Sequence, residues 1–221
     1  MNVLTLKTIA LISMIIDHYG AIFQNDIDIF RIIGRLAFPV YCFLLVEGYS
    51  HSKDVKKYAN RLFIFAIVSE LPFDLAFYNK LEFTHQNIFF TLLIGLVAIY
   101  LLDNKEEKYN FNKTLIIFTS GILSIVLYVD YSIVGIIYIL AFYFTKEYAK
   151  SKRFCSIAII MFLTNLISSP ATQQFALLAL PILYFYNGDL GPNNKVQKIL
   201  FYVAYPLHLA IYFIIKIFFS T

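Results

Sequence analysis

The 221-residue sequence has no tryptophan, only two cysteines and few charged residues, which make up 14% of the chain. Soluble domains carry about 25% charged and about 45–50% apolar residues. Here the apolar share is 60% and the mean hydropathy is +0.71. One soluble core of this size does not hold that surplus, so we expect lipid to be the solvent for much of the surface. This composition excludes an ordinary soluble enzyme, an ordinary nucleic-acid-binding protein and a disordered linker.

Neither the cysteines nor the common sequence motifs indicate a catalytic or metal-binding site. Cys42 and Cys155 both lie in apolar runs, and a disulfide framework or a zinc site needs more cysteine or histidine than this. Cys42 has no basic partner nearby in sequence, so we predict that it belongs to the core. No Walker motif, dinucleotide-binding loop, zincin signature or nucleophile elbow occurs. No metal site is expected.

Apolar segments of spanning length dominate the chain. A transmembrane helix needs about 20 apolar residues. We therefore predict an all-α polytopic integral membrane protein with about nine transmembrane helices, within a range of about eight to ten, as a single domain over 1–221 with no soluble domain. The predicted spans are 3–24, 29–50, 59–79, 86–103, 113–129, 131–147, 153–170, 172–187 and 197–219.

Two of these segments have alternatives. The 172–187 segment starts with polar residues and is interrupted near Pro170 and Pro181, so a re-entrant helix is an alternative to a full span. The first segment contains Lys7, Asp17 and His18 and has no small-residue cleavage site. We therefore interpret it as a mature helix and not as a signal peptide.

Basic residues concentrate in alternate loops, at 51–61, 103–113, 146–153 and 187–198. These loops hold Lys53, Lys56, Lys57, Arg61, Lys105, Lys108, Lys113, Lys146, Lys150, Lys152, Arg153, Lys195 and Lys198. The positive-inside rule places them and the N-terminus in the cytoplasm, with the C-terminus outside. The same loops explain the net charge of +4 without a polyanionic partner, and no nucleic acid is expected.

Ionisable residues inside the first span mark a functional site, because each costs at least about 2.5–3.5 kcal/mol to insert. Lys7 and His18 are three helical turns apart and share a face, about 16 Å from each other. His18 is a natural general base. Asp17 and His18 point about 100° apart, so Asp17 has the alternative of pairing with a cation such as Arg35. A satisfied structural pair is the non-catalytic interpretation of each of these groups.

The next two spans add a cation and two carboxylates. Arg35 needs an anionic partner, and Pro39 is expected to kink its helix. Glu70 and Asp74 are four residues apart and face the same way on either side of Pro72. They would orient a histidine, bind a cation or compensate Arg35, and an arginine–carboxylate lock remains an equal alternative.

Later polar residues favour substrate contacts. Asn87 opens the 86–103 span, and Asp130 marks another outer corner. The last span contains a Tyr-Pro-Leu-His run with Tyr205 and His208. A lone histidine on an apolar helix is more often a core residue than a catalyst. We therefore rank His208 below His18 and predict a hydrogen-bonding or substrate-facing role for it.

Together these motifs resemble the TraX family of membrane proteins, named for the acetylase of conjugative pilin. The matching stretches run from residue 6 to 208: Leu6–Ala10, Met14–His18, Ile33–Pro39, Glu47–Tyr49, Tyr58, Arg61-Leu62, Ser69–Asp74, Gln86-Asn87, Asp130-Tyr131, Tyr186–Gly188 and Tyr205–His208. The resemblance further suggests kinship with acyltransferase-3 proteins and heparan-α-glucosaminide N-acetyltransferase. Where the acyltransferase-3 pattern has arginine before its histidine, this chain has Lys7, which keeps the charge and loses the bidentate fork.

The resemblance implies a bacterial cytoplasmic-membrane acetyltransferase that uses acetyl-CoA as co-substrate. His18 would be the general base, with Asp17, Arg35, Glu70 and Asp74 around it as catalytic residues. The cofactor-binding candidates at the inner surface are Lys7, Lys53, Lys56, Lys57, Tyr58 and Arg61, and those for the acceptor are Asn87, Asp130, Tyr205 and His208. The acceptor would be an amine or hydroxyl outside the membrane, on a protein N-terminus or a cell-surface glycan.

Two other classes stay open. A small proton-coupled transporter would use Asp17, His18, Glu70 and Asp74 as a relay, although no inverted repeat is visible. A non-enzymatic membrane partner, such as an assembly or immunity factor, would bind no acyl-CoA. Oligomeric state is not encoded in any pattern of this sequence.

Overall fold

A computed structural model describes residues 1–24, 28–103, 112–168, 171–191 and 195–219. The described chain is helical, with one isolated bridge between Gln86 and Val129. The helices are α1 (Val3–Phe23), α2 (Asp28–Gly34), α3 (Ala37–Ser50), α4 (Val55–Tyr78), α5 (Ile88–Asp103), α6 (Lys113–Val126), α7 (Ser132–Phe144), α8 (Lys150–Ser168), η1 (Ala171–Leu178), α9 (Ala179–Tyr184) and α10 (Lys195–Phe219). The all-α prediction is confirmed.

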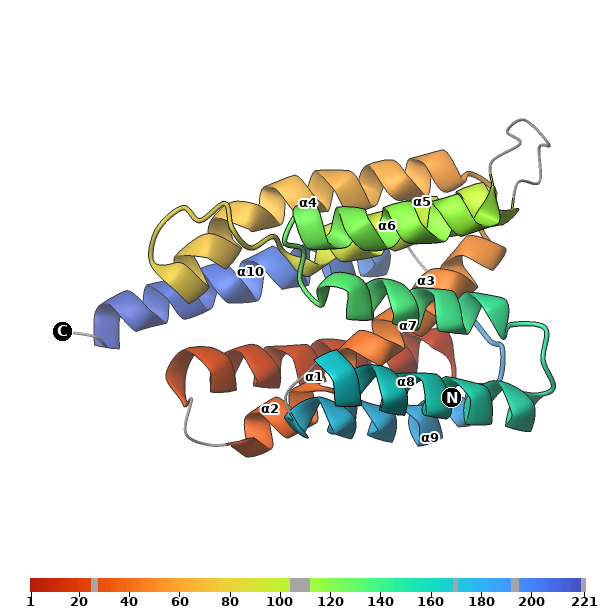
Figure 1. Cartoon of the computed structure of the whole chain (residues 1–221). Helices are drawn as coiled ribbons and strands as arrows, with labels where there is room; N and C mark the ends of the chain where they lie inside the picture. The colour runs from red at the N-terminus through yellow and green to blue at the C-terminus, as the bar shows by residue number, and fades with distance from the viewer. Residues whose placement is uncertain (25–27, 104–111, 169–170, 192–194, 220–221) are drawn as a thin grey trace.

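The helices run back and forth along one common direction, and the two termini lie at opposite ends of the bundle (Figure 1). We call the end that holds Met1 the N-terminal end. There the backbone N–H of Asn187 donates to Met1 and that of Val3 donates to Asp189, which ties the start of α1 to the turn after α9. Helix α1 packs against α2, α3 and α10, and α4 packs against α5 and α10. The seam between α1, α4 and α10 is where the candidate site lies.

Short side chains fix where several helices begin. Asn2 accepts a hydrogen bond from the backbone of Thr5 at 2.9 Å, and Asp54 accepts one from Lys57 at the same distance. Such N-caps satisfy backbone donors that have no partner inside the helix. The predicted first and third spans therefore start at defined residues, with α4 beginning a turn before the predicted 59–79 segment.

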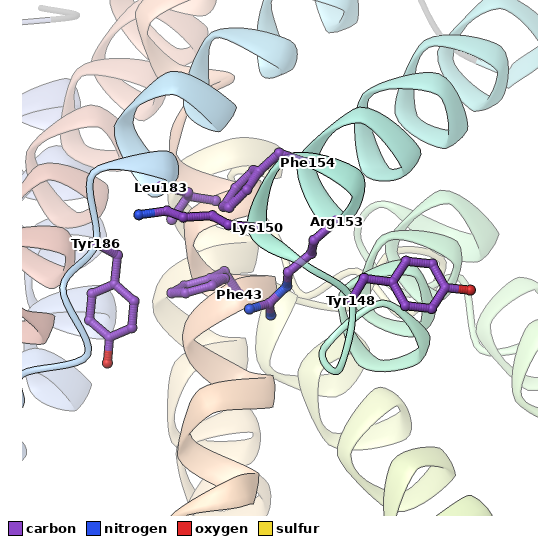
Figure 2. A pocket seen from close by; sticks show the side chains of 7 residues that line it. All are labelled: Phe43, Tyr148, Lys150, Arg153, Phe154, Leu183 and Tyr186. Carbon is purple, nitrogen blue, oxygen red and sulfur yellow. The ribbon is translucent and has the colours of Figure 1, made fainter.

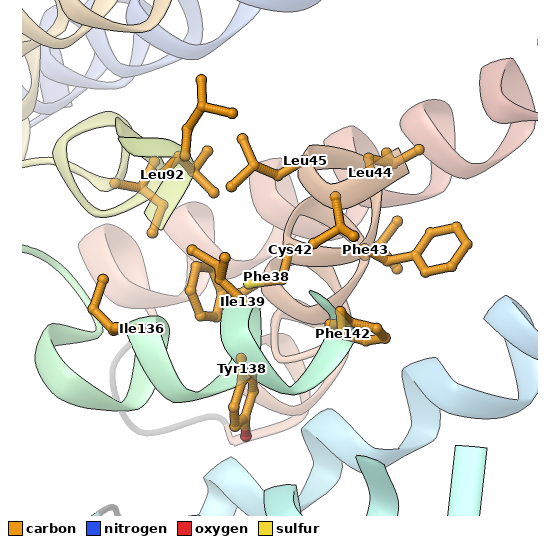
Figure 3. Close-up of a cluster of buried hydrophobic side chains, with 14 of the residues drawn as sticks. Phe38, Cys42, Phe43, Leu44, Leu45, Leu92, Ile136, Tyr138, Ile139 and Phe142 are labelled. Carbon is orange, nitrogen blue, oxygen red and sulfur yellow. The ribbon is translucent and has the colours of Figure 1, made fainter. Parts of the chain in front are cut away.

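The centre of the core is the contact between α3 and α7, with α5 beside it (Figure 3). Phe38, Phe43, Tyr138 and Phe142 are at most 2% exposed there. Cys42 is fully buried among them as a free thiol, so its predicted place in the core is confirmed. Tyr138 keeps its hydroxyl satisfied by donating to Asn165 at 2.6 Å.

The outer surface of the bundle is apolar over several helices. Residues of this surface include Phe63, Ile64, Ile67, Val68, Leu71, Leu115, Phe118, Ile122, Val126, Ile159, Leu163, Leu166 and Ile167. Exposed apolar surface on this scale is costly in water and favourable in lipid. The three helical segments Val3–Phe23, Asp28–Ser50 and Ile199–Phe218 are long and apolar enough to cross a membrane. The protein is therefore a helical membrane protein, as predicted.

The prediction of about nine spans is confirmed only in part. Beyond those three segments, the apolar helices Ile88–Asp103, Lys113–Val126, Ser132–Phe144 and Ala171–Tyr184 are shorter than a standard span. The predicted 172–187 segment consists of a 3₁₀ helix, η1, followed by the short helix α9.

The predicted 29–50 span is two helices with a break at Arg35 and Leu36. Pro39 lies in the first turn of α3, where a missing backbone N–H is tolerated. The carbonyl of Arg35 consequently has no partner four residues later, and the chain turns before Pro39 instead of kinking there. This break directs the Arg35 side chain toward α1.

Candidate active site

An ion-pair cluster joins α1 to α2 at the end of the bundle opposite to Met1. The Asp17 carboxylate lies 2.9 Å from Nη1 of Arg31 and 3.0 Å from Nη2 of Arg35. Nη1 of Arg31 also donates to the carbonyl of Asp17 at 3.1 Å. The predicted alternative, in which Asp17 pairs with Arg35, is confirmed, and Arg31 joins as a second cation.

Arg35 extends this cluster to two further elements. Its Nη1 donates to Oε1 of Gln173 in η1 at 3.0 Å and to the Tyr131 hydroxyl at 3.4 Å, and its Nε donates to the carbonyl of Arg31 at 3.2 Å. Each nitrogen of this guanidinium thus faces an acceptor within the protein. The side chain is held in place and is not directed at an open site.

Gly34 makes the ion-pair cluster sterically feasible. A Cβ at this position would lie 2.0 Å from Oδ1 of Asp17, and one at Gly20 would lie 2.4 Å from Cβ of Phe30. Each of the two helices therefore has a glycine where the other approaches it most closely. Two consecutive residues therefore serve the contact with Asp17: Gly34 lets the two helices approach each other, and Arg35 supplies the counter-ion.

Two histidines meet on the other side of α1. Nδ1 of His18 lies 2.7 Å from Nε2 of His208 in α10, although the two residues are 190 positions apart. Nδ1 of His208 lies 2.7 Å from the carbonyl oxygen of Ala204. Phe77 of α4 and Tyr205 of α10 present their ring edges to His18 at centroid distances of 5.3 and 5.8 Å. His208 is only 7% exposed, whereas His18 is partly exposed.

Several buried polar atoms of α4 and α10 have no partner, and one of them belongs to Tyr205, which packs against both histidines. Among the described residues, the hydroxyls of Ser69 and Tyr205, Oε1 of Glu70 and Oδ1 of Asp74 have no hydrogen-bond partner. Unsatisfied buried groups are rare in native structures and each invites an explanation. Three of them come from one stretch of α4 and the fourth from α10, so they outline a polar region in the seam.

The predicted carboxylate pair does not compensate Arg35. Glu70 accepts a short hydrogen bond from the side chain of Asn87, which also donates to the carbonyl of Ala66 at 2.8 Å. Oδ2 of Asp74 accepts the backbone N–H of Glu82 at 3.0 Å. Both carboxylates keep one oxygen unbonded within the described chain. Binding a cation and orienting a histidine remain the open alternatives for them.

The loop over this region is fastened by Glu82. Its carboxylate lies 2.9 Å from the ammonium of Lys80 and accepts the hydroxyl of Thr84 at 2.8 Å. The Lys80 contact and the Thr84 hydrogen bonds lower the pKa of Glu82 to about 2, so this side chain is charged at neutral pH. The backbone N–H of the same residue is the one that holds Asp74.

Asp130 lies in the neighbouring turn and is used structurally. Its carbonyl accepts a short hydrogen bond from the Thr91 hydroxyl, and its Oδ1 accepts the N–H of Tyr131 at 2.9 Å. Asp130 and Gln86 also pair through the backbone at 2.8 Å. The predicted corner at Asp130 is a turn, and Asp130 belongs to the frame around Arg35 more than to the histidine pair.

The predicted cofactor-binding residues divide into two groups at the N-terminal end. Lys7 lies 5.7 Å from the ring centroid of Phe201 in α10, and the guanidinium of Arg61 lies 5.4 Å from that of Tyr58. These residues border the same seam as the histidines. Lys53, Lys56 and Lys57 are exposed outside it, and Lys57 pairs with Asp54 at 3.2 Å.

A separate cavity of about 210 Å³ lies at the N-terminal end (Figure 2). It is lined by Phe43, Tyr148, Lys150, Arg153, Phe154, Leu183 and Tyr186. Nη2 of Arg153 lies 3.8 Å from Oε1 of Glu47. The lining comes from α3, α8, α9 and adjoining turns, and it includes neither histidine. This cavity is therefore distinct from the candidate active site.

Sequence reasoning missed two partners in the site. Gln173 lies in the polar start of the predicted 172–187 segment, and it is 4% exposed and bonded to Arg35. No pattern in the sequence singles out Arg31, although it shares Asp17 with Arg35. A buried arginine has more N–H donors than Asp17 alone accepts, so further acceptors are expected. No local sequence pattern indicates that residue 173 provides one.

Helices with an apolar exterior and polar side chains that meet between them define a helical membrane protein with a polar cluster between its helices. The chain belongs to the TraX family, because the family model described as TraX protein matches residues 3–216. A probable fimbrial assembly protein, FimC of serogroup H1, from Dichelobacter nodosus is 30% identical over 93% of this chain and 92% of its own length.

An uncharacterized protein from Rickettsia prowazekii is 31% identical over 85% of this chain and 72% of its own length. No solved structure matches the chain. The comparisons show that the chain belongs to the TraX family. They do not show a relationship to acyltransferase-3 proteins, which stays a prediction.

Substituting Gly34→Ala should lower the unfolding temperature of the purified protein, because the added methyl displaces the Asp17 carboxylate. Overpacking of this kind costs about 1–3 kcal/mol. Gly121→Ala is the matched control, since its Cβ would meet Ile133 at an ordinary 3.5 Å. Thermal unfolding in detergent measures both variants. Equal unfolding temperatures would contradict the close approach at Gly34.

Proposed function

We propose that this protein is a membrane acetyltransferase that moves the acetyl group of cytoplasmic acetyl-CoA to an amine or hydroxyl on the other side of the membrane. The observation that carries the proposal is the His18–His208 pair, held between apolar helices and packed against Tyr205, whose buried hydroxyl has no partner. Among the described residues, Nε2 of His18 has no hydrogen-bond partner, so it is available as a base.

The family supports the reaction class, because TraX proteins are associated with pilin acetylation. The fimbrial assembly protein of Dichelobacter nodosus supports a surface-fibre subunit as the acceptor. The N-terminal amine of such a subunit is one acceptor that reaches the outer side of the membrane, and a cell-surface glycan hydroxyl is the alternative. The unbonded oxygens of Glu70 and Asp74 would hold the N–H or O–H groups of the acceptor.

The orientation follows from the basic loops. We propose about nine passes, with the N-terminal end in the cytoplasm of a bacterium, because the residues of the described basic turns meet at that end. Acetyl-CoA would then approach Lys7 and Arg61 at the N-terminal end of the seam. The ammonium of Lys7 lies over the ring of Phe201 in α10, and the guanidinium of Arg61 lies over the ring of Tyr58 in α4. Lys53, Lys56 and Lys57, exposed outside the seam, would add positive charge at this end, and Tyr58 would add an aromatic side chain beside Arg61. Lysine and arginine bind phosphate through charge-assisted hydrogen bonds.

The thioester arm would pass between α1, α4 and α10 toward His18. Lys7 and His18 are 11 residues apart on α1, which places them about 16 Å apart along the helix axis. Tyr202 and Tyr205 of α10 pack against Phe89 along this path, at centroid distances of 6.1 and 5.2 Å. These aromatic side chains would exclude water from the thioester arm of the coenzyme. The thioester carbonyl would then lie beside the histidine pair.

In the transfer step, Nε2 of His18 takes the proton of the acceptor as the acceptor atom bonds to the thioester carbon. The carbonyl oxygen becomes an oxyanion, and the Tyr205 hydroxyl, buried without an acceptor of its own, donates to it. The C–S bond then breaks, and the coenzyme thiolate takes the proton from His18. An acetyl-histidine intermediate would divide the same transfer into two steps.

The ion-pair cluster has a positioning role in this proposal. Because all nitrogens of Arg35 are already bonded within the protein, an oxyanion role for Arg35 would require it to leave these partners. Asn87 is likewise saturated by Ala66, Glu70 and the N–H of Phe89. We therefore assign stabilisation of the oxyanion to Tyr205, and assign to Asp17 and Arg35 the placement of α1.

His18→Ala should reduce acetyl transfer or acetyl-CoA hydrolysis by about 10²–10⁴-fold, because the base is removed. Release of free coenzyme thiol by the purified protein in lipid nanodiscs measures the rate. His51→Ala, at an exposed histidine outside the seam, is the matched control. Undiminished activity in a folded His18→Ala protein would refute the assignment.

Tyr205→Phe should lower kcat by about 10²–10³-fold with little change in KM, since it removes one donor to the oxyanion and keeps the ring. Tyr212→Phe is the comparison, because its hydroxyl donates to the carbonyl of Ile15 at 3.0 Å and is not available to a substrate. Steady-state kinetics with acetyl-CoA separate the two constants. A change confined to KM would assign Tyr205 to substrate binding only.

The Lys7→Gln, Arg61→Gln double variant should raise KM for acetyl-CoA about tenfold, which corresponds to about 1.4 kcal/mol, with kcat preserved. Lys146→Gln removes a cation that borders Tyr143 at the same end but outside the seam, and it serves as the control. Identical KM values in both proteins would place the coenzyme phosphates elsewhere.

A non-enzymatic assembly role is the second candidate, and the printed name of the fimbrial assembly relative favours it. It differs from the first candidate in one measurable property. A stable wild-type protein that binds a fimbrial subunit and no acyl-CoA would support assembly and exclude acetyl transfer.

A further inference from the structure

We infer that His208 is a positioning residue that fixes the tautomer of His18, so that Nε2 of His18 is the basic nitrogen. This inference rests on the proposed function for its role in acetyl transfer, while the tautomer itself is a property of the resting protein. The geometry points to a chain of three groups, in the order Ala204 carbonyl, His208 and His18, each deciding the proton position of the next.

The chain begins at the Ala204 carbonyl, which has no proton to give. Because this oxygen lies 2.7 Å from Nδ1 of His208, Nδ1 must carry the proton and donate it. A neutral imidazole with a proton on Nδ1 has a lone pair on Nε2. That lone pair lies 2.7 Å from Nδ1 of His18, so Nδ1 of His18 is the donor between the rings. Nε2 of His18 is consequently left without a proton.

The ring geometry agrees with a hydrogen bond in the plane of both imidazoles. The two rings are 13° from parallel, and their centroids are 4.9 Å apart. Stacked rings separate their nearest atoms by a full van der Waals contact, which exceeds the 2.7 Å between these nitrogens. The centroid distance instead equals the nitrogen distance plus about one ring radius on each side. The rings therefore lie edge to edge, with donor and lone pair directed at each other.

Neighbouring aromatic rings hold this arrangement. Phe77 stands perpendicular to His18 at 5.3 Å, and Tyr212 stands at 88° to His208 at 5.7 Å. Tyr205 presents an edge to both imidazoles. The hydroxyl of Tyr212 also bonds to the carbonyl of Ile15, which links α10 to α1 one turn before His18. Rotation of either imidazole would require these rings to move.

A neutral imidazole here occupies the position that a carboxylate takes in a serine-protease triad, where it orients the catalytic histidine. Asp17, the neighbouring residue in sequence, is engaged with Arg31 and Arg35 and points to the other side of α1. During transfer, His208 keeps its own proton on Nδ1 and accepts the hydrogen bond from His18 throughout. The proton from the acceptor resides on Nε2 of His18 until the thiolate removes it, so His208 undergoes no net change.

Side-chain ¹⁵N NMR of histidine-labelled protein tests the tautomer without any substrate. The chain has four histidines, and His51→Gln and His85→Gln assign the other signals. We expect His18 in the resting protein to show a protonated Nδ1 and an unprotonated Nε2. In His208→Phe, which keeps a flat ring but removes the acceptor, His18 should lose this preference. An Nε2-protonated His18 in the wild type would overturn the inference.

Kinetics of two variants test the role in transfer. His208→Phe should lower kcat for acetyl transfer at least about tenfold and by up to about 10⁴-fold, the scale of a catalytic histidine held in the wrong tautomer, with KM for acetyl-CoA unchanged. His208→Gln places an amide oxygen near the former Nε2 and should recover a large part of kcat. Equal loss in both variants, or a folded His208→Phe protein with full kcat, would contradict a positioning role.

The two proposals fail in different ways. The expected ¹⁵N pattern in a wild-type protein without acetyl transfer would refute the proposed function and leave the tautomer assignment intact. Acetyl transfer that depends on His18 but is insensitive to His208→Phe would refute the positioning role and leave the proposed function intact.

Discussion

The Asp17 carboxylate, held between two arginines, is the interaction on which the rest of the site depends. Unpaired charges among apolar helices are expensive, and a buried pair loses several kcal/mol when one partner is removed. By joining α1 to α2, and through Arg35 to Tyr131 and η1, this cluster sets the rotation of α1. That rotation decides which face of α1 meets α10.

Adjacent residues of α1 thereby serve two purposes. Asp17 faces α2 and closes the ion-pair cluster, while His18, about 100° further round the helix, faces α4 and α10. The cost of burying arginine is offset within the protein, so the histidine pair is left without a nearby unpaired cation. Of the buried polar atoms that remain without a partner in the described chain, those of Ser69, Glu70 and Asp74 lie on α4 and that of Tyr205 lies on α10.

The fold could be predicted in outline because its signals are local. Apolar runs, N-caps such as Asn2 and Asp54, and the position of Pro39 act within a few residues of the structure they determine. The break at Arg35 was nevertheless misplaced to Pro39 itself, because the effect of a proline falls on the carbonyl four residues earlier. The 3₁₀ geometry of η1 was also missed, since a polar start with flanking prolines is compatible with several short helical forms.

For this protein the sequence alone determined the solvent, the helical class, the family resemblance and the short list of polar residues that lipid would not tolerate. Only the tertiary structure decided which of them meet. Gln173 reaches Arg35 across 138 positions, and His208 reaches His18 across 190. The helical period relates residues three or four apart, whereas contacts between helices depend on their rotation and packing, which close approaches such as Gly34 against Asp17 fix in three dimensions.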